Sequence, residues 1–431
     1  MKAPASKRIC AALTAGVLSV GIVAPTAVAK PPRGECRNAE PAHPVVRLLP
    51  WAQQQLMPQR AWRFTTGGGV LVAVVDSGVD TDNPQLGRPG KVLAGHDFYL
   101  RGRYPGTYDC VSHGTGVAGI IAADGADRIG FEGIAPGARI LPVRISEREL
   151  NDNGQTQAID QNILAKGIRW AVDQGARVIN LSVAGTQDHP SVRNAVAYAV
   201  AHDVVVVAAA GNQQTANASG LPSYPADYPG VIGVGAINNS GVRVAASQVG
   251  RYVDLVAPGE SVLTTTRAGG HAYQSGTSFA TPFVAGTAAL VRAAWPKLTA
   301  DQVSRRLMAT AAPAPGGTNS TEYGAGIVDP YRAVTEGLPA GKPAGMPAAT
   351  AAKPDLQQLA IAAWWQSQGT QARRVALLAG SGTATAILVC SLLIVGRRRR
   401  WAVTRHASGR QTGHADELPP EFLFARRPDE A

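Results

Sequence analysis

The sequence predicts an α/β fold of three layers, in which helices cover both faces of a mostly parallel sheet. Between residues 67 and 328, apolar runs of β type alternate with stretches of helical periodicity. Continuous Val/Ile runs bounded by glycines are typical of parallel strands that are buried on both faces. The runs read GVLVAVVDSG, ARILPVRI, ARVINLSVAG, VVVVAAAGN, GVIGVGAI and YVDLVAPG. In such sheets, reactive groups gather beyond the carboxyl ends of the strands.

The overall composition agrees with a packed domain. Of the 431 residues, 45% are apolar and 16% are charged, which excludes a disordered chain. The net charge is +11, but much of the excess lies at the two ends of the chain, and the middle mixes both signs. A nucleic-acid partner is therefore not expected.

The first 29 residues read as a signal peptide. A basic start precedes an apolar stretch over residues 9–23, and Ala27-Val28-Ala29 forms a cleavage signal, so we expect the cut after Ala29. The alternative is an uncleaved anchor helix, but the apolar stretch is short for a membrane span.

A second apolar stretch, residues 375–395, predicts a transmembrane helix. It carries no charge, has the length of about 20 residues that spans a bilayer core, and is followed by arginines at 397–400. The positive-inside rule then places the tail, residues 396–431, in the cytoplasm and the preceding domain outside the cell membrane. A buried core helix is the alternative. Residues 336–374 are rich in Pro and Ala and read as a linker.

The cysteines agree with an exported domain. Cys10 leaves with the signal peptide and Cys390 lies in the predicted span, so Cys36 and Cys110 remain in an oxidising compartment. We expect a Cys36–Cys110 disulfide; the alternative is two unpaired thiols.

Three residues of complementary chemistry stand at strand ends or helix starts. Asp76 ends a hydrophobic strand, His113 opens a helix in SHGTGVAG, and Ser278 opens a helix in SGTSFATPFVAG. Singly, they read as a turn residue, a surface histidine and a helix N-cap. Together they supply a nucleophile, the base that activates it and the acid that orients the base.

The same reaction needs donors for a tetrahedral oxyanion. Asn212 follows Gly211 where the strand VVVVAAAG ends, so its amide can donate to the developing charge, with the backbone N–H of Ser278 as partner. The small residues around Ser278 let the substrate backbone approach the nucleophile. A turn residue is the alternative for Asn212.

The blocks VAVVDSGVD, SHGTGVAGIIA, AAAGN and SGTSFATPFVAG resemble the four signature blocks of the subtilisin-like serine peptidases, and they stand in the same order. The resemblance implies catalysis by Asp76, His113 and Ser278, with Asn212 at the oxyanion. It predicts a peptidase domain over residues 55–335.

Two segments resemble the family's substrate-binding strands. Ser182, Val183 and Ala184 lie in the first, and Gly154 lies in the segment that opposes it. A peptide would add between them as a further strand.

The chain departs from the family's pattern in two places. Phe283 stands where the family often has histidine, and this position is not part of the triad. The extension over residues 30–54 is short for a folded prodomain, so we expect it to wrap on the domain permanently, with no removal needed for activation.

The succession of leader, extension, peptidase domain, linker, span and basic tail resembles the mycosins, which are membrane-anchored peptidases of type VII secretion systems. The resemblance implies an endopeptidase that processes secreted proteins, with the plasma membrane and subunits of the secretion complex as partners. The alternatives are a scaffold that stabilises that complex without proteolysis and a general scavenging peptidase.

We expect neither a cofactor nor a metal. Asp80, Asp82 and Asn83 are candidates for calcium, but this spacing alone does not assemble the roughly six to eight oxygen ligands that the ion takes.

Overall fold

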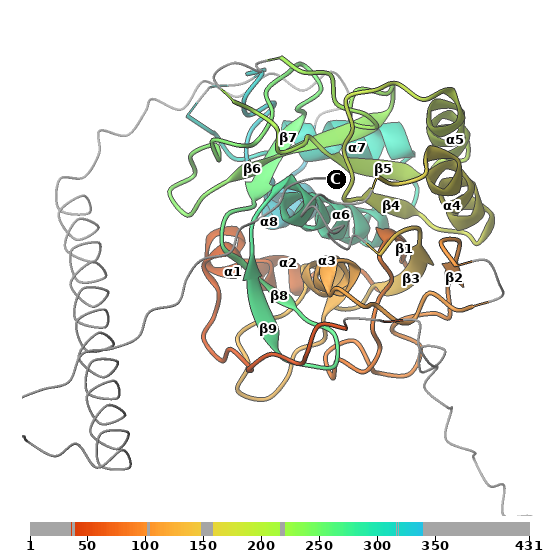
Figure 1. The fold of residues 1–431 in the computed structure, drawn as a ribbon. Coiled ribbons are helices and arrows are strands. Elements are labelled where there is room, and N and C mark those ends of the chain that lie inside the picture. The colour runs from red at the N-terminus through yellow and green to blue at the C-terminus, as the bar shows by residue number, and fades with distance from the viewer. Residues whose placement is uncertain are drawn as a thin grey trace, which may run out of the picture. The chain divides into compact units, whose positions relative to one another are not determined.

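The computed structural model describes residues 36, 39–100, 104–147, 158–215, 220–315, 317 and 319–338. The centre of this part of the chain is a seven-stranded sheet, and all neighbouring strands in it are parallel (Figure 1). The strand order is β2-β3-β1-β4-β5-β6-β7. The strands are β1 (Leu71–Asp76), β2 (His96–Asp97), β3 (Arg139–Arg144), β4 (Val178–Leu181), β5 (Val205–Ala209), β6 (Val231–Ile237) and β7 (Leu255–Pro258).

Helices cover both faces of this sheet, so the predicted three-layer fold is confirmed. The helices are α1 (Trp51–Leu56), α2 (Gln59–Trp62), α3 (His113–Ala122), α4 (Gln161–Asp173), α5 (Pro190–Ala201), α6 (Thr277–Ala294), α7 (Ala300–Ala309) and α8 (Pro330–Thr335). α3 and α6 pack together on one face of the sheet, while α4 and α5 pack together on the other (Figure 1).

The alternation of side chains along β1 separates the two helical layers. A Cβ atom added at Gly114 of α3 would lie 3.2 Å from Cβ of Asp76, and one added at Gly167 of α4 would lie 3.6 Å from Cγ1 of Val75. Every residue of β1 is buried. Val75 therefore packs under α4, whereas Asp76 faces the layer that contains α3.

Local signals explain where several helices begin. The side chain of Asp160 caps α4 by accepting a hydrogen bond from the backbone N–H of Asn162 at 2.8 Å. Thr299 and Gln302 form a capping box at the start of α7.

α6 lies on the same face of the sheet as α3 and is buried over most of its 18 residues. Its small residues allow close packing against neighbouring elements. A Cβ atom at Gly286, for example, would lie only 2.8 Å from Cβ of Ile134. The helix also contains Pro282, whose missing N–H interrupts the regular hydrogen-bond pattern.

A short antiparallel hairpin lies outside the main sheet and was not predicted. It consists of β8 (Val262–Thr265) and β9 (His271–Gln274) and packs against α3. Strands of this length carry too few residues for a clear period of two.

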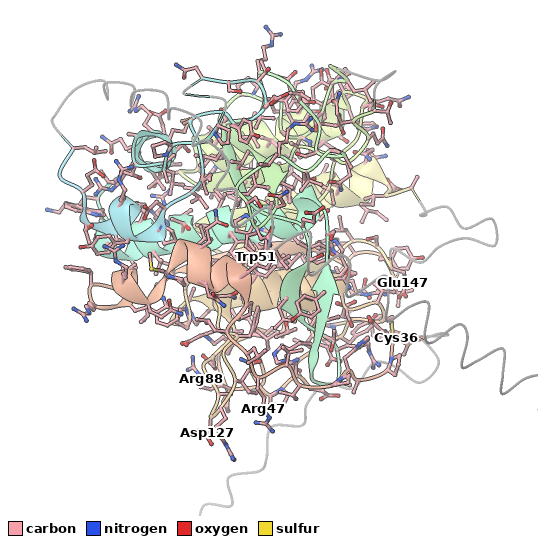
Figure 2. All side chains as sticks on the ribbon, turned by 90° about the vertical axis from the view of Figure 1, so that its left-hand side faces the viewer. Cys36, Arg47, Trp51, Arg88, Asp127 and Glu147 are labelled. Carbon is pink, nitrogen blue, oxygen red and sulfur yellow. A yellow bond between two sulfur atoms is a disulfide. The ribbon has the colours of Figure 1, made fainter. Side chains whose placement is uncertain are left out.

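The N-terminal extension lies along this hairpin and the loop before α3. Cys36 and Cys110 form a disulfide with their Cα atoms 5.4 Å apart, so the expected pairing is present in the structure. The backbone N–H of Glu40 donates to the carbonyl of Cys110 at 2.9 Å, and that of His43 donates to Gly269 at 3.1 Å. Three residues of the extension, Cys36, Arg47 and Trp51, can be located in Figure 2.

Several predicted segments lie outside the described residues. These are the signal peptide, nearly all of the linker, the transmembrane helix over 375–395, the tail over 396–431, and Gly154. Among the residues that the structure describes, no helix has the length and apolar character needed to cross a membrane. The chain divides into two compact units, residues 1–351 and 352–431, and all described residues belong to the first.

Candidate active site

The structure brings Asp76 and His113 into direct contact. Asp76 is fully buried at the carboxyl end of β1, and its Oδ1 lies 2.7 Å from Nδ1 of His113, the first residue of α3. Oδ1 also accepts a hydrogen bond from the backbone N–H of Ser77 at 2.7 Å. A carboxylate held in this way keeps the proton of a neutral imidazole on Nδ1, so Nε2 is the ring atom that can accept one.

A second buried carboxylate, Asp109, holds the start of α3 in place. Asp109 accepts hydrogen bonds from the Ser77 hydroxyl at 3.0 Å and from the backbone N–H of Thr115 at 2.9 Å. The Ser77 hydroxyl in turn accepts the N–H of Gly114 at 2.9 Å. Burial raises the pKa of the Asp109 carboxyl. This network fixes the backbone on both sides of the Asp76–His113 pair.

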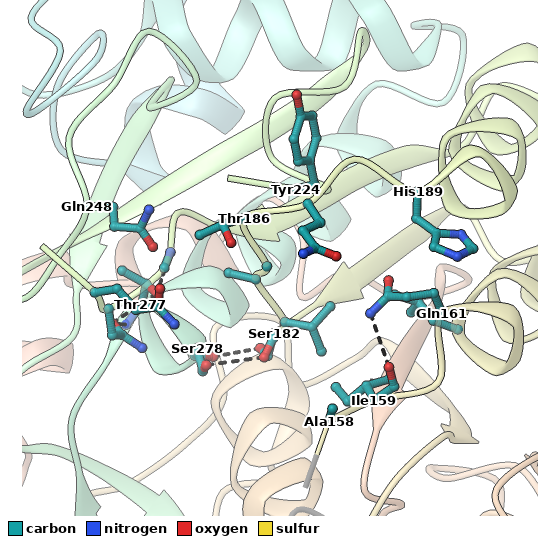
Figure 3. A pocket seen from close by; sticks show the side chains of 18 residues that line it. Ala158, Ile159, Gln161, Ser182, Thr186, His189, Tyr224, Gln248, Thr277 and Ser278 are labelled. Atoms are coloured by element: carbon teal, nitrogen blue, oxygen red, sulfur yellow. Dashed lines mark hydrogen bonds between the residues drawn. The ribbon is translucent and has the colours of Figure 1, made fainter. Parts of the chain in front are cut away.

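Ser278 lies in the first turn of α6, which packs against α3. The ring of its neighbour Phe279 packs against the imidazole of His113, with the ring centroids 4.9 Å apart. Ser278 and Ser182 are joined by two hydrogen bonds in opposite directions (Figure 3). The Ser278 hydroxyl donates to the Ser182 carbonyl at 3.1 Å, and the Ser182 hydroxyl donates to the Ser278 carbonyl at 2.6 Å.

The carbonyl oxygen of the Asn212 side chain is fixed by the start of α6. It accepts hydrogen bonds from the backbone N–H of Thr277 at 2.9 Å and from the Thr277 hydroxyl at 3.1 Å. Because Oδ1 is used in this way, Nδ2 is the group that Asn212 can offer to a ligand. A Cβ atom at Gly276 would lie 3.2 Å from Nδ2, so the glycine keeps the space beside this donor open.

A pocket of about 530 Å³ opens beside Ser278 (Figure 3). Ser182, Val183, Ala184 and Asn212 from the sequence-predicted set line it. Figure 3 shows Gln161 and His189 at the end away from Ser278. The lining residues that the sequence did not single out include Ala158, Ile159, Gln161, Leu164, Gly185, His189, Tyr224 and Gln248.

At least two of these additional lining residues, Tyr224 and Gln248, are brought to the pocket by tertiary contacts. Tyr224, for example, exchanges backbone hydrogen bonds with Gly185, each 2.8 Å long. The backbone N–H of Gln248 donates to the Gly211 carbonyl at 2.9 Å. These pairs are remote in sequence, so no local pattern could have indicated them. Ala158 and Ile159 directly follow the segment around Gly154 that is predicted to oppose Ser182, Val183 and Ala184.

Two of the calcium candidates, Asp80 and Asn83, make hydrogen bonds to other groups of the protein. Asp80 accepts the backbone N–H groups of Asp82 at 2.9 Å and of Ala268 at 3.0 Å. The Asn83 amide donates to the Thr266 carbonyl at 2.8 Å. In the described part of the chain, no group of three or more His, Cys, Asp or Glu residues could hold a metal ion.

The profile of the subtilase family matches residues 67–326, which contain all of these site residues. The chain belongs to the subtilase family. It is a serine endopeptidase of the subtilisin type, as the resemblance implied.

Individual relatives of this subtilase fall into two groups. It is 37% identical to subtilisin NAT of Bacillus subtilis subsp. natto over 289 residues, which cover 67% of this chain and 72% of the relative. It is 38% identical to mycosin-4 of Mycobacterium tuberculosis over 313 residues, or 64% of this chain and 67% of the relative. Its fold is similar to that of MycP1 from the ESX-1 type VII secretion system, with a TM-score of 0.60 and 31% identity. That match covers 72% of this chain and 91% of MycP1.

Proposed function

We propose that Asp76, His113 and Ser278 form the catalytic triad of this subtilase. The observation that carries the proposal is the 2.7 Å contact between Asp76 and His113, at the start of a helix that packs against α6, the helix that carries Ser278. As Ser278 Oγ attacks a peptide carbonyl, His113 Nε2 accepts its proton and then passes it to the leaving amine. Water then hydrolyses the acyl-enzyme with His113 again as base.

Asn212 and the amino terminus of α6 supply the electrostatic part of the mechanism. The Asn212 Nδ2 group and the backbone N–H of Ser278 donate to the oxyanion of the tetrahedral intermediate. The partial positive charge at the start of α6 stabilises the same negative charge. The bonds from Thr277 support this assignment because they hold the Asn212 amide in one orientation before substrate binds.

The substrate is a protein segment in extended conformation. Its backbone lies along Ser182, Val183 and Ala184, and its side chains enter the pocket that these residues line. Ala158 and Ile159 line the same pocket and are our candidates for the opposing wall, next to the predicted Gly154 segment.

A serine-directed fluorophosphonate tests the catalytic proposal. The soluble ectodomain should be labelled covalently, whereas the Ser278→Ala form should not. Equal labelling of the two proteins would show that Ser278 is not the nucleophile.

We further propose that this enzyme is anchored in the cell membrane and processes secreted substrates of a type VII secretion system. The likeness to mycosin-4 and to MycP1 of the ESX-1 system supports this proposal. The apolar, uncharged stretch over 375–395 and the arginines that follow it supply the anchor and the cytoplasmic tail. The signal peptide over residues 1–29 directs export.

A scaffold role in the secretion complex is the second candidate, because the same likeness supports it. The Ser278→Ala variant separates the two in the producing cell. If substrate cleavage stops and secretion stops with it, proteolysis is required. If cleavage stops and secretion persists, the chain also supports the complex through its structure.

We also propose that the extension over residues 30–54 stays on the mature enzyme. The disulfide and the hydrogen bonds to Cys110 and Gly269 support this. Sequencing the N-terminus of the isolated protein tests it, because a start beyond Cys36 would contradict a permanent extension.

A further inference from the structure

The carbonyl of Ser278 cannot be satisfied by its own helix. In an α-helix, the carbonyl of each residue accepts the N–H of the residue four positions later. The residue four positions after Ser278 is Pro282, which has no N–H. The helix therefore leaves an acceptor without its regular donor at the half-buried residue proposed as nucleophile. A backbone carbonyl that is shielded from water needs a hydrogen-bond partner.

Ser182 supplies that donor from the other side of the site. Its hydroxyl is fully buried and donates to the Ser278 carbonyl at 2.6 Å. The amide of Asn180, also fully buried at the end of β4, donates to the Ser182 hydroxyl at 2.9 Å. The Asn180 bond occupies a lone pair of the hydroxyl oxygen and so directs the hydroxyl proton towards Ser278.

The second bond between the two serines involves the reactive atom itself. The hydroxyl of Ser278 donates to the Ser182 carbonyl at 3.1 Å, so backbone and side chain of Ser278 are both held by one residue (Figure 3). Ser182 also lines the pocket in which the substrate backbone is proposed to lie. The proposed nucleophile is thereby tied to the segment after β4 along which the substrate is proposed to lie.

We infer that Ser182 is a positioning residue for the nucleophile, and that Pro282 creates the need for it. This inference rests on the proposed role of Ser278. An N–H at position 282 would hold the Ser278 carbonyl within the helix. With proline there, the carbonyl is held by Ser182, which follows β4 and lines the proposed substrate pocket. The attacking oxygen is thereby fixed relative to the proposed position of the substrate. Small displacements of reacting groups have large effects on rate, so this link should be visible in the kinetics.

A four-protein cycle tests the inference: the unmodified ectodomain, Ser182→Ala, Pro282→Ala and the double variant. The probe is a fluorophosphonate, whose concentration dependence of labelling gives a maximal rate, kinact, and a half-saturating concentration, KI. We expect Ser182→Ala to lower kinact about tenfold with KI unchanged, a change that corresponds to about 1.4 kcal/mol. In the Pro282→Ala background, the same Ser182 change should cost less than about threefold, because the N–H gained at position 282 serves the Ser278 carbonyl.

Thr287→Val is the matched control. The Thr287 hydroxyl donates to the Phe283 carbonyl at 2.7 Å, so the variant removes a similar buried bond two turns further along α6. It should lower the thermal midpoint without changing kinact. Asn180→Ala offers a second approach that leaves Ser182 in place, and it should lower kinact at least threefold.

The outcomes separate this inference from the proposed function. If the unmodified protein is not labelled, or Ser278→Ala is labelled equally, the proposed nucleophile is wrong. If labelling depends on Ser278 but Ser182→Ala acts on KI alone, acts equally in both backgrounds, or has no effect, only the positioning role is overturned. An unchanged kinact for Asn180→Ala would overturn the relay through Asn180.

Discussion

The backbone N–H of Val46 donates a hydrogen bond to Nδ1 of His271, 3.1 Å away. This bond joins the N-terminal extension to the β8–β9 hairpin. Because Nδ1 accepts here, the neutral ring carries its proton on Nε2, which donates to Gln85 Oε1 at 2.7 Å. His271 is buried, and its ring packs against that of Phe131. The extension is therefore held by a histidine that must stay neutral.

Acid should weaken this attachment. Burial lowers the pKa of His271 from 6.5 to about 4. The unfolded chain takes up the proton first as pH falls, so the contribution to stability is complete above pH ~6.5 and is lost as pH falls towards ~4. We expect a loss of up to about 3 kcal/mol from this group, measured by urea unfolding between pH 7 and pH 4.5.

The His271→Asn variant provides the control for this acid effect. It should be less stable at pH 7 and should lose less stability than the parent over the same range. Protection factors for hydrogen exchange at residues 39–47, which correct for the intrinsic pH dependence of exchange, should fall on acidification in the parent only. An identical pH dependence in the two proteins would contradict the role of His271.

Asp254 should have the opposite effect on the pH dependence of the stability. Burial raises the pKa of its carboxyl from 3.8 to about 6, although the side chain accepts the Gly233 N–H at 2.9 Å. Its contribution to stability is complete below pH ~3.8 and is lost as pH rises through ~6. Asp254→Asn keeps an acceptor and removes the charge, so it should raise the free energy of unfolding by about 1–3 kcal/mol at pH 8. The same denaturant titration at pH 4 should show no gain, and a gain of equal size there would contradict the explanation.

The disulfide should contribute to the stability of the domain as well as to the attachment of the extension. Cys36 and Cys110 are separated by 74 positions, and closing a loop of this length contributes about 4 kcal/mol in the chain-entropy treatment. The Cys36→Ser/Cys110→Ser variant should therefore unfold about 2–4 kcal/mol more easily. Reducing agent should destabilise the parent and leave this variant unchanged. A variant as stable as the parent would show that the disulfide contributes nothing to the stability of the domain.

Gly276→Ala should impair Asn212, the proposed oxyanion donor. The glycine has a φ of 138°, which disfavours any other residue, and the added methyl group would lie 3.2 Å from Asn212 Nδ2. We expect a loss in kinact for fluorophosphonate labelling of ~10- to 100-fold, less than the ~100- to 1,000-fold loss for removing one oxyanion donor, because the substitution displaces the donor and does not remove it. Gly68→Ala is the control, because a Cβ atom there meets nothing within 4 Å. If Gly276→Ala is equally harmful in an Asn212→Ala background, it does not act through Asn212.

Much of the fold could be predicted because its signals are local. The run LVAVV over residues 71–75 is apolar throughout and lies between glycines at 69 and 78, and it forms most of the fully buried β1 in the interior of the sheet. The two-residue strand β2 and the β8–β9 hairpin were not predicted, since such short segments show no distinct periodicity. Pairing between short strands is decided by the surfaces against which they pack.

The candidate site divides in the same way. The sequence predicts four site residues from their neighbours: Asp76, His113, Asn212 and Ser278. Each lies where the adjacent residues indicate the end of a strand or the start of a helix. Tyr224 and Gln248 line the same pocket, but each reaches it through backbone pairing with a residue remote in sequence. Such pairings cannot be predicted from a single sequence.

The sequence by itself determined the layered α/β architecture, the complementary chemistry of acid, base and nucleophile, and the two cysteines available for pairing. Only the tertiary structure decided which group replaces the N–H that Pro282 lacks, because the Ser182 hydroxyl that does so is 96 positions from Ser278. The physical reason is that periodicity and capping act over a few residues. A buried hydrogen-bond acceptor, by contrast, must take its donor from whatever the packed chain brings within about 3 Å.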